Sequence, residues 1–191
     1  METSIQQLSQ RLLDLELGDW DKKSEYDILL VNSRMSAIMT VVLTLADNEG
    51  RFMSSSGLYS DTRNLFERFL PRIGIECTMV TNPLDIEEWE HRLAITSFVR
   101  FLFAENYNVD NRALAHLAHR VRIPYISDRS MSNAVLEPLI PFEVDVVIHE
   151  EGLGSAIIAR KELIQKIRNG WFGALETMLK PEMAQQILIG K

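Results

Sequence analysis

The sequence contains a single cysteine, Cys77, and this scarcity excludes two kinds of small-protein architecture. No disulfide can form within one chain, and a structural zinc site would lack its thiolate ligands. No apolar run approaches the ~18 residues of a membrane-spanning helix. The first residues, METSIQQLSQRLLDLE, are polar and acidic, unlike a signal peptide. We therefore expect a cytoplasmic protein without a membrane segment, in which Cys77 is a small buried strand residue.

Basic residues are also too few and too scattered for a nucleic-acid surface. The chain has 20 Lys and Arg against 27 Asp and Glu, a formal net charge of −7. Binding to a phosphate backbone requires clustered Lys and Arg. The four histidines lack metal-ligand spacing, and His116 and His119 are expected on the solvated face of a helix. Neither a nucleic-acid partner nor a metal site is predicted.

Helical and extended patterns alternate along the chain, and 46% of the residues are hydrophobic, enough for a full core. Strands are predicted at 26–31, 51–55, 75–80, 98–104, 123–127, 144–149 and 155–160. Helices are predicted at 4–17, 33–46, 60–70, 83–93, 111–121, 161–170 and 173–189. This order predicts an α/β fold, a mostly parallel sheet of about seven strands flanked by helices, as a single domain over residues 1–191.

The residues that follow the strands are the candidate site, because open α/β sheets bind ligands beyond the carboxyl ends of their strands. Ser33 would begin a helix whose free N–H groups could bind an anion, although Ser33 or Asn32 could equally be an ordinary N-cap. Tyr59 could stack on a flat ligand or pack on the surface. Asp128 could pair with a protonated ring nitrogen or cap a helix. A hydrolytic triad of Ser33, His149 and Asp128 is rejected, since no GxSxG sequence surrounds the serine.

Read in order, these segments resemble the Cys/Met metabolism family of pyridoxal phosphate (PLP)-dependent enzymes, which includes cystathionine γ-synthase and lyase. GLYSDTRNLFERFLPRIGIE at 57–76 is similar to the family's LYGGTYxLF loop, helix and following strand. LLVNSRMSAI at 29–38 resembles its SGMAAI phosphate loop, and ENYN at 105–108 a shortened ESPSNP. Residues 124–150 resemble its VDNTFATP…GADIVVHS stretch. The resemblance runs from about residue 10 to the end, and implies the large domain of fold-type I PLP-dependent transferases.

The resemblance also implies roles for individual residues. Tyr59 would stack on the pyridine ring, and Asp128 would keep the ring nitrogen protonated so that the ring can accept electrons. Asn108 would approach the ring hydroxyl. The cofactor-binding candidates, including those around the phosphate, are Ser33, Arg34, Met35, Tyr59, Asn108, Asp128 and Ser130.

Several departures from the family pattern argue against its chemistry. The Schiff-base lysine belongs in a loop resembling SATKFIGGHSD, but here VVIHEEGLGSAII is shorter, and the chain has no lysine between Lys23 and Lys161. Without that amine the cofactor cannot be held covalently. Arg34 replaces a phosphate-loop glycine and is expected to fill the pocket. Ser60 and Asp61 replace two further glycines, and the family's small C-terminal domain is expected to be absent.

The favoured hypothesis is a non-catalytic interaction or regulatory pseudoenzyme that binds no PLP covalently. Two alternatives stay open: a PLP-dependent lyase or transferase of sulfur amino acids, and a small-ligand-binding module that uses Tyr59 and Asp128. A homo-oligomer, most simply a dimer, or a complex with a protein partner is expected, although the last helix could instead fold back on the sheet. The apolar patch that suggests an interface contains Trp171, Phe172, Leu175, Met178 and Leu179.

Overall fold

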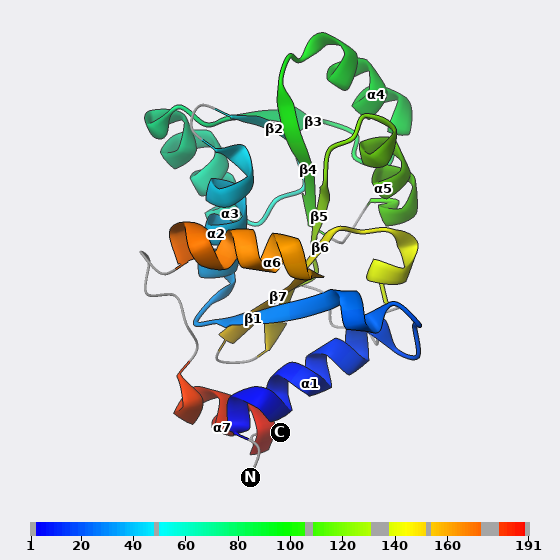
Figure 1. The fold of residues 1–191 in the computed structure, drawn as a ribbon. Helices are drawn as coiled ribbons and strands as arrows, with labels where there is room; N and C mark the ends of the chain where they lie inside the picture. The colour runs from blue at the N-terminus through cyan, green and yellow to red at the C-terminus, as the bar shows by residue number, and fades with distance from the viewer. Residues whose placement is uncertain are drawn as a thin grey trace.

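A computed structural model describes residues 3–47, 50–105, 109–130, 138–151, 154–172 and 180–189. Its centre is one seven-stranded sheet with the order β1-β7-β6-β5-β4-β2-β3 (Figure 1). The predicted α/β class is therefore confirmed. The strands are β1 (Tyr26–Val31), β2 (Arg51–Ser55), β3 (Glu76–Val80), β4 (Val99–Glu105), β5 (Tyr125–Asp128), β6 (Val146–Glu151) and β7 (Gly154–Arg160).

One strand alone runs against the others. β7 is antiparallel to both of its neighbours, β1 and β6, whereas the remaining pairs are parallel. Since β1 and β6 are both antiparallel to β7, β1 and β6 point in the same direction. β1 is therefore also parallel to β5, β4, β2 and β3. The carboxyl ends of these six strands meet at one edge of the sheet, and only β7 ends at the opposite edge.

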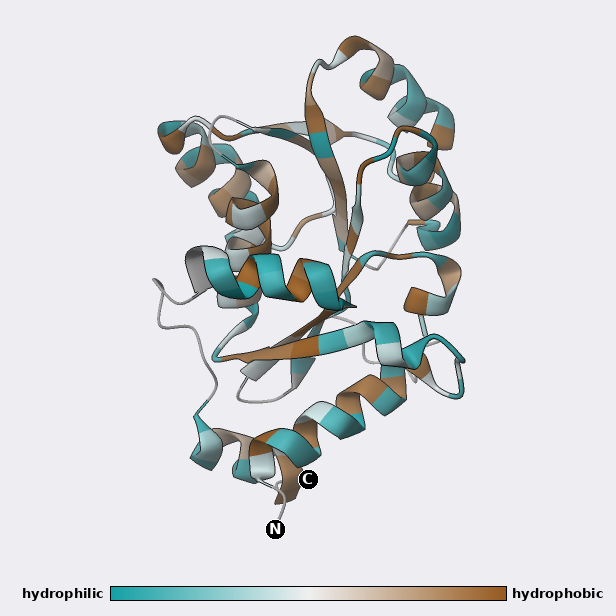
Figure 2. Cartoon of the chain, viewed as in Figure 1, coloured by the Kyte–Doolittle hydropathy of each residue, from teal (hydrophilic) through white to brown (hydrophobic). Residues whose placement is uncertain are grey.

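Helices cover both faces of the sheet. One face carries α2 (Arg34–Ala46), α3 (Ser60–Asn64) and α6 (Lys161–Ile167), and the other carries α1 (Ser4–Leu17), α4 (Ile86–Ile95), α5 (Asn111–Arg120) and α7 (Pro181–Ile189) (Figure 1). Apolar residues concentrate on the strands and the inner sides of the helices (Figure 2). On the α2 face the core is aromatic: Phe52 stacks on Phe101, and Phe66 makes T-shaped contacts with Phe52 and Phe103. On the other face Trp89, Leu8 and Leu12 are fully enclosed.

Helix starts follow the capping signals of the sequence. Ser33 is the N-cap of α2, and its hydroxyl oxygen accepts the N–H of Ser36 at 3.1 Å. Thr3 and Gln6 form a reciprocal capping box at the start of α1. Asp85 caps α4 by accepting the backbone N–H groups of the first turn.

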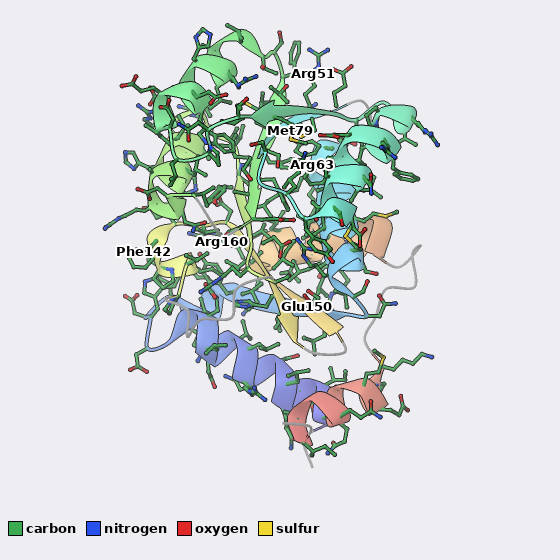
Figure 3. All side chains as sticks on the ribbon, turned by 180° about the vertical axis from the view of Figure 1, so that it is seen from behind. Arg51, Arg63, Met79, Phe142, Glu150 and Arg160 are labelled. Atoms are coloured by element: carbon green, nitrogen blue, oxygen red, sulfur yellow. The ribbon has the colours of Figure 1, made fainter. Side chains whose placement is uncertain are left out.

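Most predicted elements differ from the structure by a few residues at their ends, and three differ in kind or position. The helix expected at 60–70 is α3 followed by a π-helical turn at Leu65–Phe69 and a 3₁₀ turn at Leu70–Ile73, which Gly74 ends with a φ of 83°. β6 runs on to Glu151, so Glu150 lies on the β6–β7 hairpin and not in a loop (Figure 3). Of the helix expected at 173–189, α7 supplies Pro181–Ile189, while residues 173–179 lie outside the described residues.

The side chains of the predicted apolar patch, Trp171, Phe172, Leu175, Met178 and Leu179, also lie outside the part that the structure describes. The expected dimer therefore stays a prediction. None of the described helices has the length and apolar content that crossing a membrane requires.

Candidate functional site

Two carboxylates lie side by side at the carboxyl edge of the sheet. Glu105 is the last residue of β4, Asp128 is the last residue of β5, and the two are Cα partners in the parallel register. Both are almost fully buried, at 1% and 2% exposure. Like charges in a buried site destabilise one another unless a cation joins them. The register of two parallel strands thus creates a local requirement for positive charge.

Arg34, the first residue of α2, supplies that charge. Its Nε donates to Asp128 Oδ2 at 2.9 Å, its Nη2 lies 2.9 Å from the same oxygen, and Nη2 also forms an ion pair with Glu105. The arginine side chain is 7% exposed. Because β1 points the same way as β4 and β5, the residue that follows β1 emerges at the edge where both carboxylates lie.

Tyr59 completes this group. The guanidinium carbon of Arg34 lies 5.2 Å from the centre of the Tyr59 ring, within cation–π distance. The backbone N–H of Tyr59 donates to Glu105 Oε2 at 2.6 Å. We call these four residues, Arg34, Tyr59, Glu105 and Asp128, the Arg34 cluster.

The electrostatics of the Arg34 cluster are set by burial and by its three charges. Burial by itself would lower the pKa of Arg34, but the neighbouring charges of Asp128 and Glu105 outweigh it and raise that pKa. Burial raises the pKa of Glu105, and the positive charge of Arg34 opposes part of this rise. The arginine therefore stays charged, and it is the group that allows two carboxylates to be buried together.

The structure brings together four of the residues that the sequence singled out. Arg34, Tyr59 and Asp128 are in contact, and Ser130 donates its N–H to Asp128 Oδ1 at 3.0 Å. Ser33 is exposed and serves as a helix cap. Two other candidates add little: Met35 is half-buried and packs against the core, and Asn108 lies outside the described residues. The cofactor-binding roles of all seven stay predictions.

The arrangement of these side chains does not fit the pyridine ring of PLP. The ring would require the carboxylate of Asp128 and the face of Tyr59, and the guanidinium of Arg34 engages both. The second oxygen of Asp128 accepts the N–H of Ser130. Glu151 and Gly154 are register partners in the β6–β7 hairpin, and the sequence has no lysine between them.

A second buried ionic group lies on the opposite face of the sheet, at Glu16 of α1. Its Oε2 accepts from Arg129 Nη1 at 2.9 Å and lies 2.8 Å from Nε2 of His149. Its Oε1 accepts the backbone N–H groups of Leu139 at 2.6 Å and Ile140 at 3.1 Å. His149, the histidine of the rejected hydrolytic triad, therefore contacts Glu16 in the interior of the fold. The described residues contain no group of three or more His, Cys, Asp or Glu placed to hold a metal ion.

The sequence analysis assigned no role to Glu105, although it lies in the ENYN segment at 105–108, and it did not identify Glu16. Glu105 carries the same signal as Asp128, an acid that directly ends a buried strand. Glu16 is signalled by spacing, since Leu8 and Leu12 define a four-residue repeat on the apolar face of the helix and position 16 continues it. An acid where the repeat requires an apolar residue predicts a buried partner.

Comparison with known proteins gives consistent matches. The family described as Cys/Met metabolism PLP-dependent enzyme matches residues 5–152. O-acetyl-L-homoserine sulfhydrylase of Corynebacterium glutamicum is 28% identical over 81% of this chain and 37% of its own length. Methionine gamma-lyase of Arabidopsis thaliana is 29% identical over 82% of this chain and 38% of its own. The chain thus spans less than two fifths of either relative.

A solved structure shares the fold. O-acetylhomoserine sulfhydrylase of Wolinella succinogenes superposes with a TM-score of 0.84 at 24% identity, covering 98% of this chain and 61% of that one. At this level of identity the likeness concerns the arrangement of the strands and helices.

Proposed function

The chain belongs to the Cys/Met metabolism PLP-dependent enzyme family, and we propose that it is a member without the family's chemistry, a pseudoenzyme domain that acts through protein interaction or regulation. The observation that carries the proposal is the Arg34 cluster. The two side chains that the family pattern assigns to the cofactor ring, Tyr59 and Asp128, are bound by a guanidinium of the same chain.

The positions of the lysines support the proposal. Covalent binding of PLP needs a side-chain amine, and lysine is the residue that provides it. Lys23 precedes β1, and Lys161 follows β7, whose last residue is the register partner of the first residue of β1. Both therefore lie at the edge of the sheet opposite to Glu105 and Asp128. An amine at that edge is separated from the Arg34 cluster by the length of the strands.

A reduction experiment tests the proposal. The purified protein is incubated with PLP, treated with borohydride and weighed by mass spectrometry, with the C. glutamicum sulfhydrylase as the comparison. We expect no stoichiometric adduct on any single lysine and no release of thiol or oxoacid from sulfur amino acids. A stoichiometric adduct on Lys161 or Lys166 together with turnover would overturn the proposal and establish that the attachment lysine has moved.

The proposal extends to location and assembly. A cytoplasmic location is supported by the single half-buried thiol of Cys77, which offers no disulfide framework for an oxidising compartment. A pseudoenzyme must act through contacts, so we expect a homo-oligomer or a complex with a protein partner. Sedimentation velocity at micromolar concentration measures directly whether the protein forms a homo-oligomer.

A further inference from the structure

β3 forms one edge of the sheet, so only one of its two sides is paired with another strand (Figure 1). At its two ends, Glu76 donates its N–H to a carbonyl just before β2, and Val80 accepts an N–H from just after β2. In a strand, the N–H and C=O of one residue point to the same side, and successive residues alternate between the two sides. Glu76, Thr78 and Val80 therefore bind β2, whereas Cys77 and Met79 direct their main-chain groups away from the sheet. In the described part of the chain, no hydrogen bond reaches these outward groups.

The opposite edge of the sheet, at β1, is protected in ways that β3 is not. The carboxylate of Asp27 accepts the N–H of Ile28 at 2.8 Å and so occupies a donor of that strand, and both α1 and α6 contact β1. Three features that commonly keep an edge strand from pairing are absent from β3. Residues 77–80 contain no charged side chain and no proline, and the register with β2 is continuous, without a bulge. β3 thus offers a regular, uncharged row of main-chain donors and acceptors.

We propose that β3 pairs with β3 of a second copy of this chain, antiparallel and about a two-fold axis at Thr78. In this register Cys77 of one copy lies opposite Met79 of the other, so every outward N–H meets a carbonyl of the other copy. Glu76 lies opposite Val80, so the two acids do not face each other, and the two Thr78 side chains form a cross-strand pair. Because the strand is complementary to itself in hydrogen bonding and in charge, it fits a second copy. The inference rests on the homo-oligomer expected under the proposed function and names its surface.

Exposed apolar side chains flank β3 and add to the surface that the pairing would cover. Phe69 and Ile73 end the two helical turns that precede β3 and contact it, and they are 44% and 48% exposed. Leu84, in the turn that follows β3, is 63% exposed. The edge of one strand buries less than the roughly 1,200–2,000 Å² of a stable interface, so flanking surface is required. Antiparallel pairing places the end of one β3 beside the start of the other, which brings these apolar segments of the two copies toward the same joint.

A proline substitution tests the pairing without removing a hydrogen bond inside the sheet. Met79→Pro deletes an outward N–H only, and an edge strand accepts proline where the N–H faces solvent. We expect the full chain to sediment as a dimer at micromolar concentration, and Met79→Pro to raise the dimer dissociation constant by about tenfold or more. Met79→Ala is the matched control, because it shortens the same side chain, keeps the N–H and should remain dimeric. Circular dichroism checks the fold of both variants.

Cysteine cross-linking tests the register and does not depend on the proline variant. The two Thr78 residues would form a non-hydrogen-bonded antiparallel pair, whose Cα atoms lie about 4.5 Å apart, within the range of a disulfide. In a Cys77→Ala background, Thr78→Cys should therefore give a covalent dimer on mild oxidation. Glu76→Cys in the same background is the control, because the two copies of this residue would lie about 13 Å apart along the strands and should not cross-link.

The outcomes of these two experiments separate pairing through β3 from the other possibilities. A clean monomer would overturn the inference and leave the edge to a strand of a different protein. A dimer that Met79→Pro leaves unchanged, or Glu76→Cys cross-linking as efficiently as Thr78→Cys, would place the dimer contact elsewhere or in another register and would also overturn it. A PLP adduct with turnover would end the pseudoenzyme proposal, whereas loss of the β3 pairing alone would end only this assignment.

Discussion

Replacing Arg34 by methionine removes the positive charge of the Arg34 cluster and keeps an unbranched side chain of comparable length. The variant leaves two carboxylates, Glu105 and Asp128, buried at 1% and 2% exposure without their cation. Removing one partner of a buried ion pair destabilises a protein by about 3–5 kcal/mol. Since a typical domain has a free energy of unfolding of about 5–15 kcal/mol, the loss is a large part of the total. Urea unfolding, monitored by tryptophan fluorescence, measures this loss in the free energy of unfolding.

The pH dependence of Arg34→Met separates a charge effect from a packing effect. Burial raises the pKa of Glu105 even beside Arg34, and loss of the guanidinium raises it further. A carboxyl whose pKa is higher in the folded state binds more protons when folded, so stability falls as the pH rises from its unfolded pKa to its folded pKa. The loss of stability caused by Arg34→Met should therefore become smaller as the pH is lowered from about 7 to about 5.

Arg51→Met is the matched control. Arg51 pairs with Glu76 at 2.7 Å on the surface, where the two side chains are 44% and 61% exposed, so its loss should change stability by less than about 1 kcal/mol. Adding Glu105→Gln and Asp128→Asn to Arg34→Met should recover most of the lost stability, because no buried charge remains. If Arg34→Met behaves like the control, or if its penalty is the same at both pH values, the charge argument is refuted.

Three further predictions concern other parts of the chain. Glu16→Gln should destabilise the fold by about 3 kcal/mol by removing the buried carboxylate that pairs with Arg129, and hydrogen exchange should show the largest loss of protection in α1. Arg34→Gly frees the carboxylate of Asp128, so equilibrium dialysis should detect weak PLP binding, still without a borohydride-stable adduct. Burial raises the pKa of the Cys77 thiol, so native protein at neutral pH should react with a disulfide reagent far more slowly than unfolded protein.

The sequence predicts the elements of this fold well where burial alone determines them. The ranges 26–31 and 51–55 match β1 and β2 to the residue. For β1 the reason is a short apolar run, YDILLV, bounded by polar residues. Strand starts predicted at 98 and 123 begin later in the structure, since Phe98 and Ile123 are apolar but belong to turns. The π-helical turn after α3 was not predicted, because local propensity does not distinguish it from an α-helical turn.

The sequence predicted which residues form the candidate site but not which of them contact one another. The rule that ligand sites follow strand ends identified Arg34, Tyr59 and Asp128, and the structure brings them into contact. Which residue Asp128 binds depends on the register of β4 and β5, which places Glu105 beside it and makes a cation necessary. A register between two strands separated by a whole helix cannot be obtained from the local sequence.

The pairing of the first strand, β1, with the last strand, β7, affects the order in which the chain can fold during synthesis. β1 lies at an edge of the sheet and finds its partner in β7, while Glu16 of α1 binds groups on the strand ends of β5 and β6. The N-terminal segment is therefore synthesised before the strand on which it docks. At a ribosomal rate of 5–20 residues per second, it waits for a time on the order of ten seconds before β7 exists. During that interval the apolar face of α1, with Leu8, Leu12 and Leu17, is available to chaperones, and its docking is expected to be a slow phase of folding.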